Sequence, residues 1–190
     1  MTAADQVTAF AESRRAAVLL FGWGMFEAVV FFVIPDVLLY VLAAAAPRRA
    51  ARLLAWTIAG ALAGSVLLYV LAVARPDAAQ GLLIAVPGIH RPMLDAAITK
   101  VAGGDPLALV QFGPGTPLKV YTVAWASGVG SILALLVGVV VNRLSRIGPG
   151  VVVSAVAGFV APTLLRRFRL VLGIAYVVTW LVYYWVRLTG

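Results

Sequence analysis

Five ionisable residues lie inside apolar stretches of this chain, and their types would suit them to bind an anion: Glu27, Asp36, Lys119, Arg143 and Arg146. A charge at the centre of a bilayer costs at least about 2.5–3.5 kcal/mol, so such residues normally face inward and pair. The three bases outnumber the two acids by one, and an arginine fork binds phosphate oxygens in a bidentate manner. We therefore predict that the three bases bind an anionic head group and that the two acids carry protons.

The spacing of these residues constrains how they come together. Glu27 and Asp36 are nine positions apart, which places them on opposite faces of an unbroken helix. A break at Pro35 removes that conflict and lets both carboxylates face inward. Arg143 and Arg146 are three positions apart and share a helix face. Two alternatives stay open: the cluster is a purely structural set of ion pairs, or Arg146 reaches the membrane interface instead.

The composition is that of a membrane protein. Of the 190 residues, 63% are hydrophobic and 12% are charged, with a mean hydropathy of +1.04, whereas soluble domains have roughly half and a quarter. The chain has no cysteine and one histidine, His90, so we expect no metal, no cofactor and no enzymatic activity. Arginines at the ends of apolar runs give a net charge of +8, which favours contact with anionic lipid over nucleic acid.

We predict one all-α integral membrane domain over residues 1–190. The run 16–46 is too long for one span of about 20 residues, and proline interrupts it at Pro35. The run 132–165 would be about 50 Å long as one helix, so it must tilt, kink at Pro149 or split. The predicted elements are a re-entrant hairpin over 16–46, a transmembrane helix over 53–74, a polar extracytoplasmic connection over 75–105, a second re-entrant hairpin over 106–131, a long broken helix over 132–165 and a C-terminal transmembrane helix over 170–186.

Two of these segments carry further detail. Within 75–105 we expect a short interfacial helix over 92–102, with Met93, Ala96, Ala97 and Val101 on one face, and His90 in a loop. The second hairpin is inferred from the breaks at Gly113, Pro114, Gly115 and Pro117, because irregular backbone at membrane depth survives only where protein or water satisfies it. Gly60 and Gly64 permit close helix approach, either inside the chain or in a homodimer.

A hairpin followed by a long helix occurs twice in this order. Counting basic residues places eight arginines of the flanks 14–15, 48–52 and 166–169 on the cytoplasmic side and four basic residues on the other. Under that topology the two copies point in opposite directions. Inverted repeats with broken helices that meet near the midplane are the plan of many secondary transporters, so we expect the site between two opposed hairpins.

Three ordered motifs resemble the DedA superfamily of SNARE-associated or VTT-domain membrane proteins, and specifically its YqaA-like branch. Residues 27–39, EAVVFFVIPDVLL, are similar to E-S-x-F-F-P-I-P-P-D-V-L-L, and Gly60, Gly64, Ser65 and Tyr69 stand like its glycine-rich helix. Residues 115–122, GTPLKVYT, are similar to G-I-P-Y-K-V-F-T. Residues 142–147, NRLSRI, stand where the branch has G-R-x-x-R-F.

The resemblance implies two facing re-entrant hairpins with essential acidic and basic residues. It also implies proton-coupled flipping or scrambling of a lipid, such as undecaprenyl phosphate or a phospholipid, in the bacterial inner membrane. Two other functions stay open from the residues: a membrane-embedded enzyme acting on a lipid phosphate, for which His90 is the only imidazole, and an assembly factor that transports nothing.

Overall fold

A computed structural model describes residues 3–30, 36–102, 116–128 and 131–163, and scattered positions between 171 and 185. Within this part of the chain the secondary structure is helical and no strand is present, which confirms the predicted helical class. The helices are α1 (Ala3–Glu12), α2 (Arg14–Val29), α3 (Asp36–Ala45), the 3-10 helix η1 (Pro47–Arg49), α4 (Ala50–Ala74), α5 (Pro76–Ile84), α6 (Arg91–Val101), α7 (Leu118–Ala126) and α8 (Ile132–Val160).

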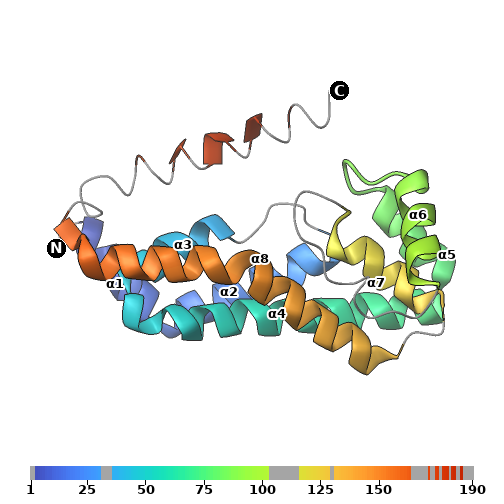
Figure 1. Cartoon of the computed structure of the whole chain (residues 1–190), viewed down its shortest axis with the longest axis horizontal. Helices are drawn as coiled ribbons and strands as arrows, with labels where there is room; N and C mark the ends of the chain where they lie inside the picture. Colours follow the sequence, from blue (N-terminus) through green and yellow to red (C-terminus); the bar gives the residue numbers. More distant parts are fainter. Residues whose placement is uncertain are drawn as a thin grey trace.

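Two long apolar helices run the length of the molecule in opposite directions, α4 and α8 (Figure 1). The segments Pro47–Ala74 and Ile132–Val160 are each long and apolar enough to cross a membrane. Ser131 caps the start of α8, where its hydroxyl oxygen accepts a hydrogen bond from the backbone N–H of Ala134 at 3.1 Å. Such a cap satisfies one of the amide groups that a helix start leaves without a partner.

Helix α2 packs closely along α4 because glycines line their contact. A Cβ atom at Gly60 would collide with the backbone of Phe21, and one at Gly64 would collide with Met25 and Ala28. This register means that α2 and α4 run in the same direction. The glycines therefore act within the chain, as one of the two predicted alternatives has it, and they bring the α2 backbone against that of α4.

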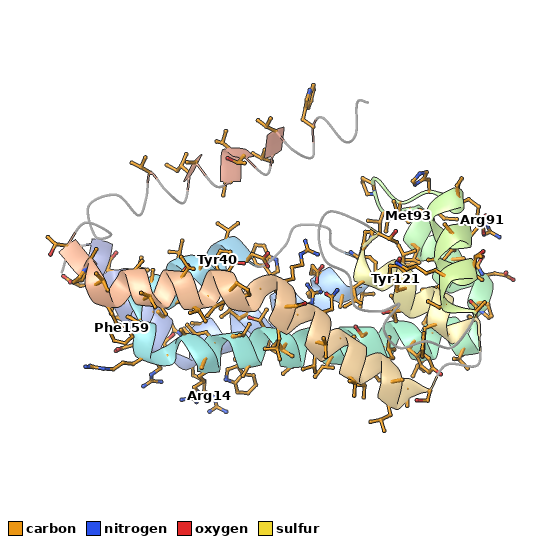
Figure 2. All side chains as sticks on the ribbon, in the orientation of Figure 1. Arg14, Tyr40, Arg91, Met93, Tyr121 and Phe159 are labelled. Carbon is orange, nitrogen blue, oxygen red and sulfur yellow. The ribbon has the colours of Figure 1, made fainter. Side chains whose placement is uncertain are left out.

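Helix α3 lies along α8 in a similar way. Gly150 faces the ring of Tyr40, which Figure 2 labels, and Gly158 faces the backbone of Ala44. Helix α3 therefore runs parallel to α8, and so opposite to α2. These are the directions that a hairpin over 16–46 requires. Its turn at Pro35 lies outside the described residues.

The helices α5, α6 and α7 lie together at the end of the molecule where α4 ends (Figure 1). Figure 2 labels Arg91 and Met93 of α6 and Tyr121 of α7 there. Helix α6 occupies the place of the predicted short helix over 92–102, and Met93, Ala97 and Val101 of its predicted face are covered as expected, whereas Ala96 is not. Ala96 is exposed, and the buried residues are Leu94, Ala97 and Val101. The reason is that α6 packs against α7, so the residues facing that helix are the ones covered. Helix α5 was not predicted.

The segment predicted as a long broken helix is one continuous helix from Ile132 to Val160, followed by Ala161 outside it. Pro149 lies inside α8, and the ribbon changes direction near its middle (Figure 1). Proline has no backbone N–H, and its ring crowds the carbonyl of the residue four positions earlier, which bends a helix without ending it. Of the three predicted possibilities, the continuous helix excludes a split over 132–160, and the bend of the ribbon is in line with the kink.

Several predictions fall on residues outside the described ranges. The breaks at Gly113, Pro114 and Gly115 and the first arm of the second hairpin belong to them, whereas Pro117 is described and directly precedes α7. Much of the predicted helix over 170–186 also falls outside, although the described positions within it are helical.

Candidate functional site

An ion pair joins the last turn of α2 to the middle of α8. The Arg143 guanidinium donates a hydrogen bond from Nη2 to Oε2 of Glu27, and the relative exposures of the two residues are 1% and 8%. Glu27 belongs to the buried face of α2 with Leu20, Gly24 and Ala28, at the i, i+4, i+7 and i+8 spacing of one helix face. The close approach of α2 to α4 holds this face inside the protein.

Asp36 is the second buried acid, and it is the first residue of α3. It interacts electrostatically with Arg146 and Arg143 and is repelled by Glu27. Its Oδ1 atom is buried and has no hydrogen-bond partner among the residues that the structure describes. The structure thus places both predicted acids inward and near the same arginines, as the sequence spacing predicts for a broken helix.

Lys119 reaches the same cluster from a third direction. It lies in the first turn of α7, is 3% exposed, and interacts electrostatically with Glu27 and Arg143. Every residue of α7 from Leu118 to Trp125 is buried. The indole N–H of Trp125 donates to the carbonyl of Ser131 at 3.1 Å, which ties the end of α7 to the cap of α8.

Arg146 differs from the other four predicted residues because it is exposed. It lies one turn beyond Arg143 on α8 and still interacts electrostatically with Asp36. The structure therefore differs from the prediction that all five residues face inward, and it is in line with the alternative in which Arg146 lies apart from the other four. Helix periodicity allows Arg143 to point into the bundle while Arg146, offset by about 60° around the helix, stays at its edge.

The structure adds polar residues that the sequence reasoning did not select for the site. Asn142 precedes Arg143 and is 4% exposed, and Ser65 on α4 is 1% exposed. The Oδ1 atom of Asn142, the Oγ atom of Ser65 and the Nε atom of Arg143 are all buried without a hydrogen-bond partner. A polar residue next to an arginine in an apolar run was the available signal for Asn142. Buried polar groups normally have partners, so each of these atoms, which has none among the described residues, is available to a ligand.

The site has one positive charge more than it has negative charges, which an added anion would neutralise. Glu27 and Asp36 offset Arg143 and Lys119, and Arg146 at the edge adds one positive charge. The end of α2, the start of α3 and the middle of α8 all lie in the central part of the molecule (Figure 1). A guanidinium with an unused N–H in apolar surroundings is a strong donor to an oxyanion.

The remaining site predictions concern residues elsewhere. His90 is exposed and directly precedes α6, outside any helix, as predicted for a loop residue. Over the described residues, no group of three or more His, Asp or Glu side chains could hold a metal ion. Comparison of the chain with family models, with curated proteins and with solved structures found no match.

Proposed function

We propose that this chain is a membrane-embedded, DedA-like transporter that moves a lipid with an anionic head group, together with protons, across the bacterial inner membrane. The observation that carries the proposal is the buried set Glu27, Asp36, Lys119 and Arg143 inside helices whose outer surface is apolar. Each of the following points supports one part of this proposal.

The apolar outer surface supports a lipid environment. Soluble monomers rarely expose contiguous apolar patches larger than a few hundred Å², yet aliphatic and aromatic side chains project outward along α2, α4 and α8. Examples that are more than half exposed are Val18, Leu67, Val70, Val73, Leu133, Val137, Val152, Val153, Val156 and Phe159. A protein with charges inside and apolar groups outside is stable where the surroundings are hydrocarbon.

The internal charges support a transport role. Ionisable residues within membrane segments are costly, and they mark substrate and proton pathways by default. An anion that binds Arg143 competes with Glu27 for the same guanidinium. Glu27 is then left without its partner in apolar surroundings, where a bound proton removes its charge. Release of the anion restores the ion pair, and the proton leaves. One exchange of partners thus couples the two movements.

The arrangement of the helices is compatible with an inverted repeat. The two membrane-length helices run in opposite directions, and shorter helices pack beside both of them, α2 and α7 mainly against α4 and α3 mainly against α8. Lys119 at the start of α7 and Glu27 at the end of α2 then approach one site from two sides. In the proposed transporter, α2–α3 and the 106–131 segment are the two re-entrant hairpins.

The experiment is a translocation assay in proteoliposomes of phosphatidylcholine and phosphatidylglycerol with a pH gradient. A fluorophore on the phosphatidylglycerol head group reports its accessibility to an impermeant quencher. Glu27→Gln and Arg143→Ala should abolish translocation. The exposed residues Glu12 and Arg52 supply matched controls, Glu12→Gln and Arg52→Ala, which should translocate at the wild-type rate.

Correct insertion of each variant is checked by its elution profile and by protease accessibility. Wild-type rates in both site variants would overturn the proposal. Release of inorganic phosphate from vesicles that also contain phosphatidic acid, a phosphomonoester, would identify a lipid phosphatase instead if it is lost in His90→Ala. A wild-type protein that neither translocates nor hydrolyses lipid would point to an assembly factor.

A further inference from the structure

Two pairs of exposed arginines lie at the end of the molecule where α2 and α4 begin. Arg14 and Arg15 start α2, and Arg48 and Arg49 belong to η1, directly before α4. The Arg49 guanidinium donates a hydrogen bond from Nη1 to the backbone carbonyl of Glu12 at 3.4 Å, which ties η1 to the residues just before α2. Figure 2 shows Arg14 at this end of the molecule.

The packing of α2 along α4 brings the two pairs together. The Cβ position of Gly60 faces the backbone of Phe21, and the two helices run in the same direction. In this register Arg14 lies level with Leu53, about one helical turn after Arg49. Two segments that are far apart in the chain therefore form one arginine surface, Arg14, Arg15, Arg48 and Arg49.

Exposed apolar side chains lie next to the arginine surface, one turn further along the helices. Val18 and Leu19 follow Arg14 and Arg15 at the i, i+4 spacing of neighbours on a helix, and they are 64% and 42% exposed. On α4, Trp56 is 40% exposed, and tryptophan is typical of the membrane–water interface. Charged groups beside apolar groups match the head and the chains of a lipid, whereas a soluble anion would leave the apolar groups uncovered.

The arginine surface is separate from the buried ion pair. Arg14 and Glu27 lie near opposite ends of α2, about 20 Å apart along the helix at 1.5 Å per residue. A lipid at the arginine surface is therefore a different molecule from one bound at Arg143. Four guanidinium groups exceed the single negative charge of one phosphodiester, and each of them can bind phosphate oxygens in a bidentate manner.

We propose that the arginine surface binds an anionic phospholipid with two phosphate groups, one for each arginine pair, and that this lipid stays bound and is not transported. Clustered basic residues at the ends of membrane helices recognise anionic head groups in this way. The inference rests on the membrane-embedded part of the proposed function and not on translocation.

The test is a lipid titration of the protein in dodecylmaltoside, read by thermal unfolding. Diphosphatidylglycerol, which has two phosphates, is compared with phosphatidylglycerol, which has one, at equal phosphate concentration. Diphosphatidylglycerol should raise the midpoint of thermal unfolding more than phosphatidylglycerol does, and native mass spectrometry should show it retained on the chain. Soluble pyrophosphate should leave the midpoint unchanged, because it cannot cover the apolar groups beside the arginines.

Arginine variants locate the binding. Arg14→Gln combined with Arg48→Gln should weaken the binding of diphosphatidylglycerol about 25-fold, since each basic residue near a charged lipid surface contributes about fivefold. Arg75 and Arg91 are exposed at the other end of the molecule, so Arg75→Gln combined with Arg91→Gln removes the same charge and should leave the affinity unchanged. Arg14→Lys combined with Arg48→Lys keeps the charge but not the fork, and its affinity should lie between those of the wild type and the first variant. The midpoint of each variant without lipid shows that it is folded.

Equal shifts of the midpoint with the two lipids would overturn the inference, as would a shift with pyrophosphate or an equal loss of affinity in the two glutamine variants. These outcomes are independent of the translocation assay, whose vesicles contain no diphosphatidylglycerol. A chain that translocates phosphatidylglycerol without preferring diphosphatidylglycerol in the titration would leave the proposed function standing and remove only this lipid site. A preference in a chain that does not translocate would do the reverse.

Discussion

Arg143 on α8 forms a buried ion pair with Glu27 on α2, although 116 positions separate the two residues in the chain. The pair connects two helices that have their main contacts elsewhere, α2 with α4 and α8 with α3 and α4. It therefore ties the α2–α4 unit to the α3–α8 unit at the centre of the molecule. Because the pair lies in the proposed site, a ligand that binds Arg143 would break this connection between the two units.

The ion pair should show strong non-additivity in stability. Removing one partner leaves the other charge buried and unpaired, which costs about 3–5 kcal/mol. Glu27→Gln and Arg143→Gln should each lower the midpoint of thermal unfolding in detergent, and the double variant should be more stable than the sum of the two losses predicts. Glu12→Gln, at an exposed acid, is the control. Additive losses would show that the two side chains do not interact.

Replacing Asp36 should impair translocation without destabilising the protein. Its Oδ1 atom is buried with no hydrogen-bond partner among the described residues. Burial of the charge and repulsion by Glu27 oppose its attraction to Arg146 and Arg143, so we expect that Asn can replace the carboxylate with little loss of stability. Asp36→Asn should keep or raise the midpoint of thermal unfolding while it slows translocation on the order of 100-fold, the effect of losing a proton-carrying group. A variant that unfolds earlier and transports normally would assign Asp36 to structure alone.

The contact between α2 and α4 should depend on Gly60. A Cβ atom there would meet the backbone of Phe21, which cannot move aside as a side chain can. Gly60→Ala should therefore destabilise the protein by about 1–3 kcal/mol, as overpacking of an interior does. Gly22 lies on α2 with open space beside it, so Gly22→Ala should be neutral or slightly stabilising. Thermal unfolding of both variants decides the matter, and equal midpoints would contradict this packing.

Pro149 should be the cause of the bend in α8. Spin labels at Leu133 and Phe159, which are 69% and 56% exposed, can be attached through introduced cysteines because the chain has none of its own. A straight helix would separate the two Cα atoms by about 39 Å at 1.5 Å per residue. The wild-type distance should be shorter, and Pro149→Ala should lengthen it. Gly148→Ala, with open space at its Cβ, should leave it unchanged; an equal distance in Pro149→Ala would place the bend elsewhere.

The individual helices could be predicted from the sequence better than their arrangement. The helical class, the uncharged helix at 53–74 and the short helix near 92–102 follow from local apolar periodicity and from proline and glycine breaks. Helix α5 was missed because its apolar residues lie in the most polar stretch. On α6 the prediction included Ala96 and left out Leu94, because the expected neighbour was a membrane interface and the actual neighbour is α7.

For the site, too, the sequence predicts the residues better than their arrangement. Glu27, Asp36, Lys119 and Arg143 are recognisable from the sequence because a charge within an apolar run is costly, and that cost belongs to each residue in its own segment. The sequence alone therefore determined that these four residues face inward, although the same argument also selected Arg146. Only the tertiary structure decided that Glu27 pairs with Arg143, that Arg146 stays at the edge and that Ser65 and Asn142 are buried without partners. The physical reason is that pairing depends on how closely helices approach, and glycines such as Gly60 set that approach through contacts with residues far away in the chain.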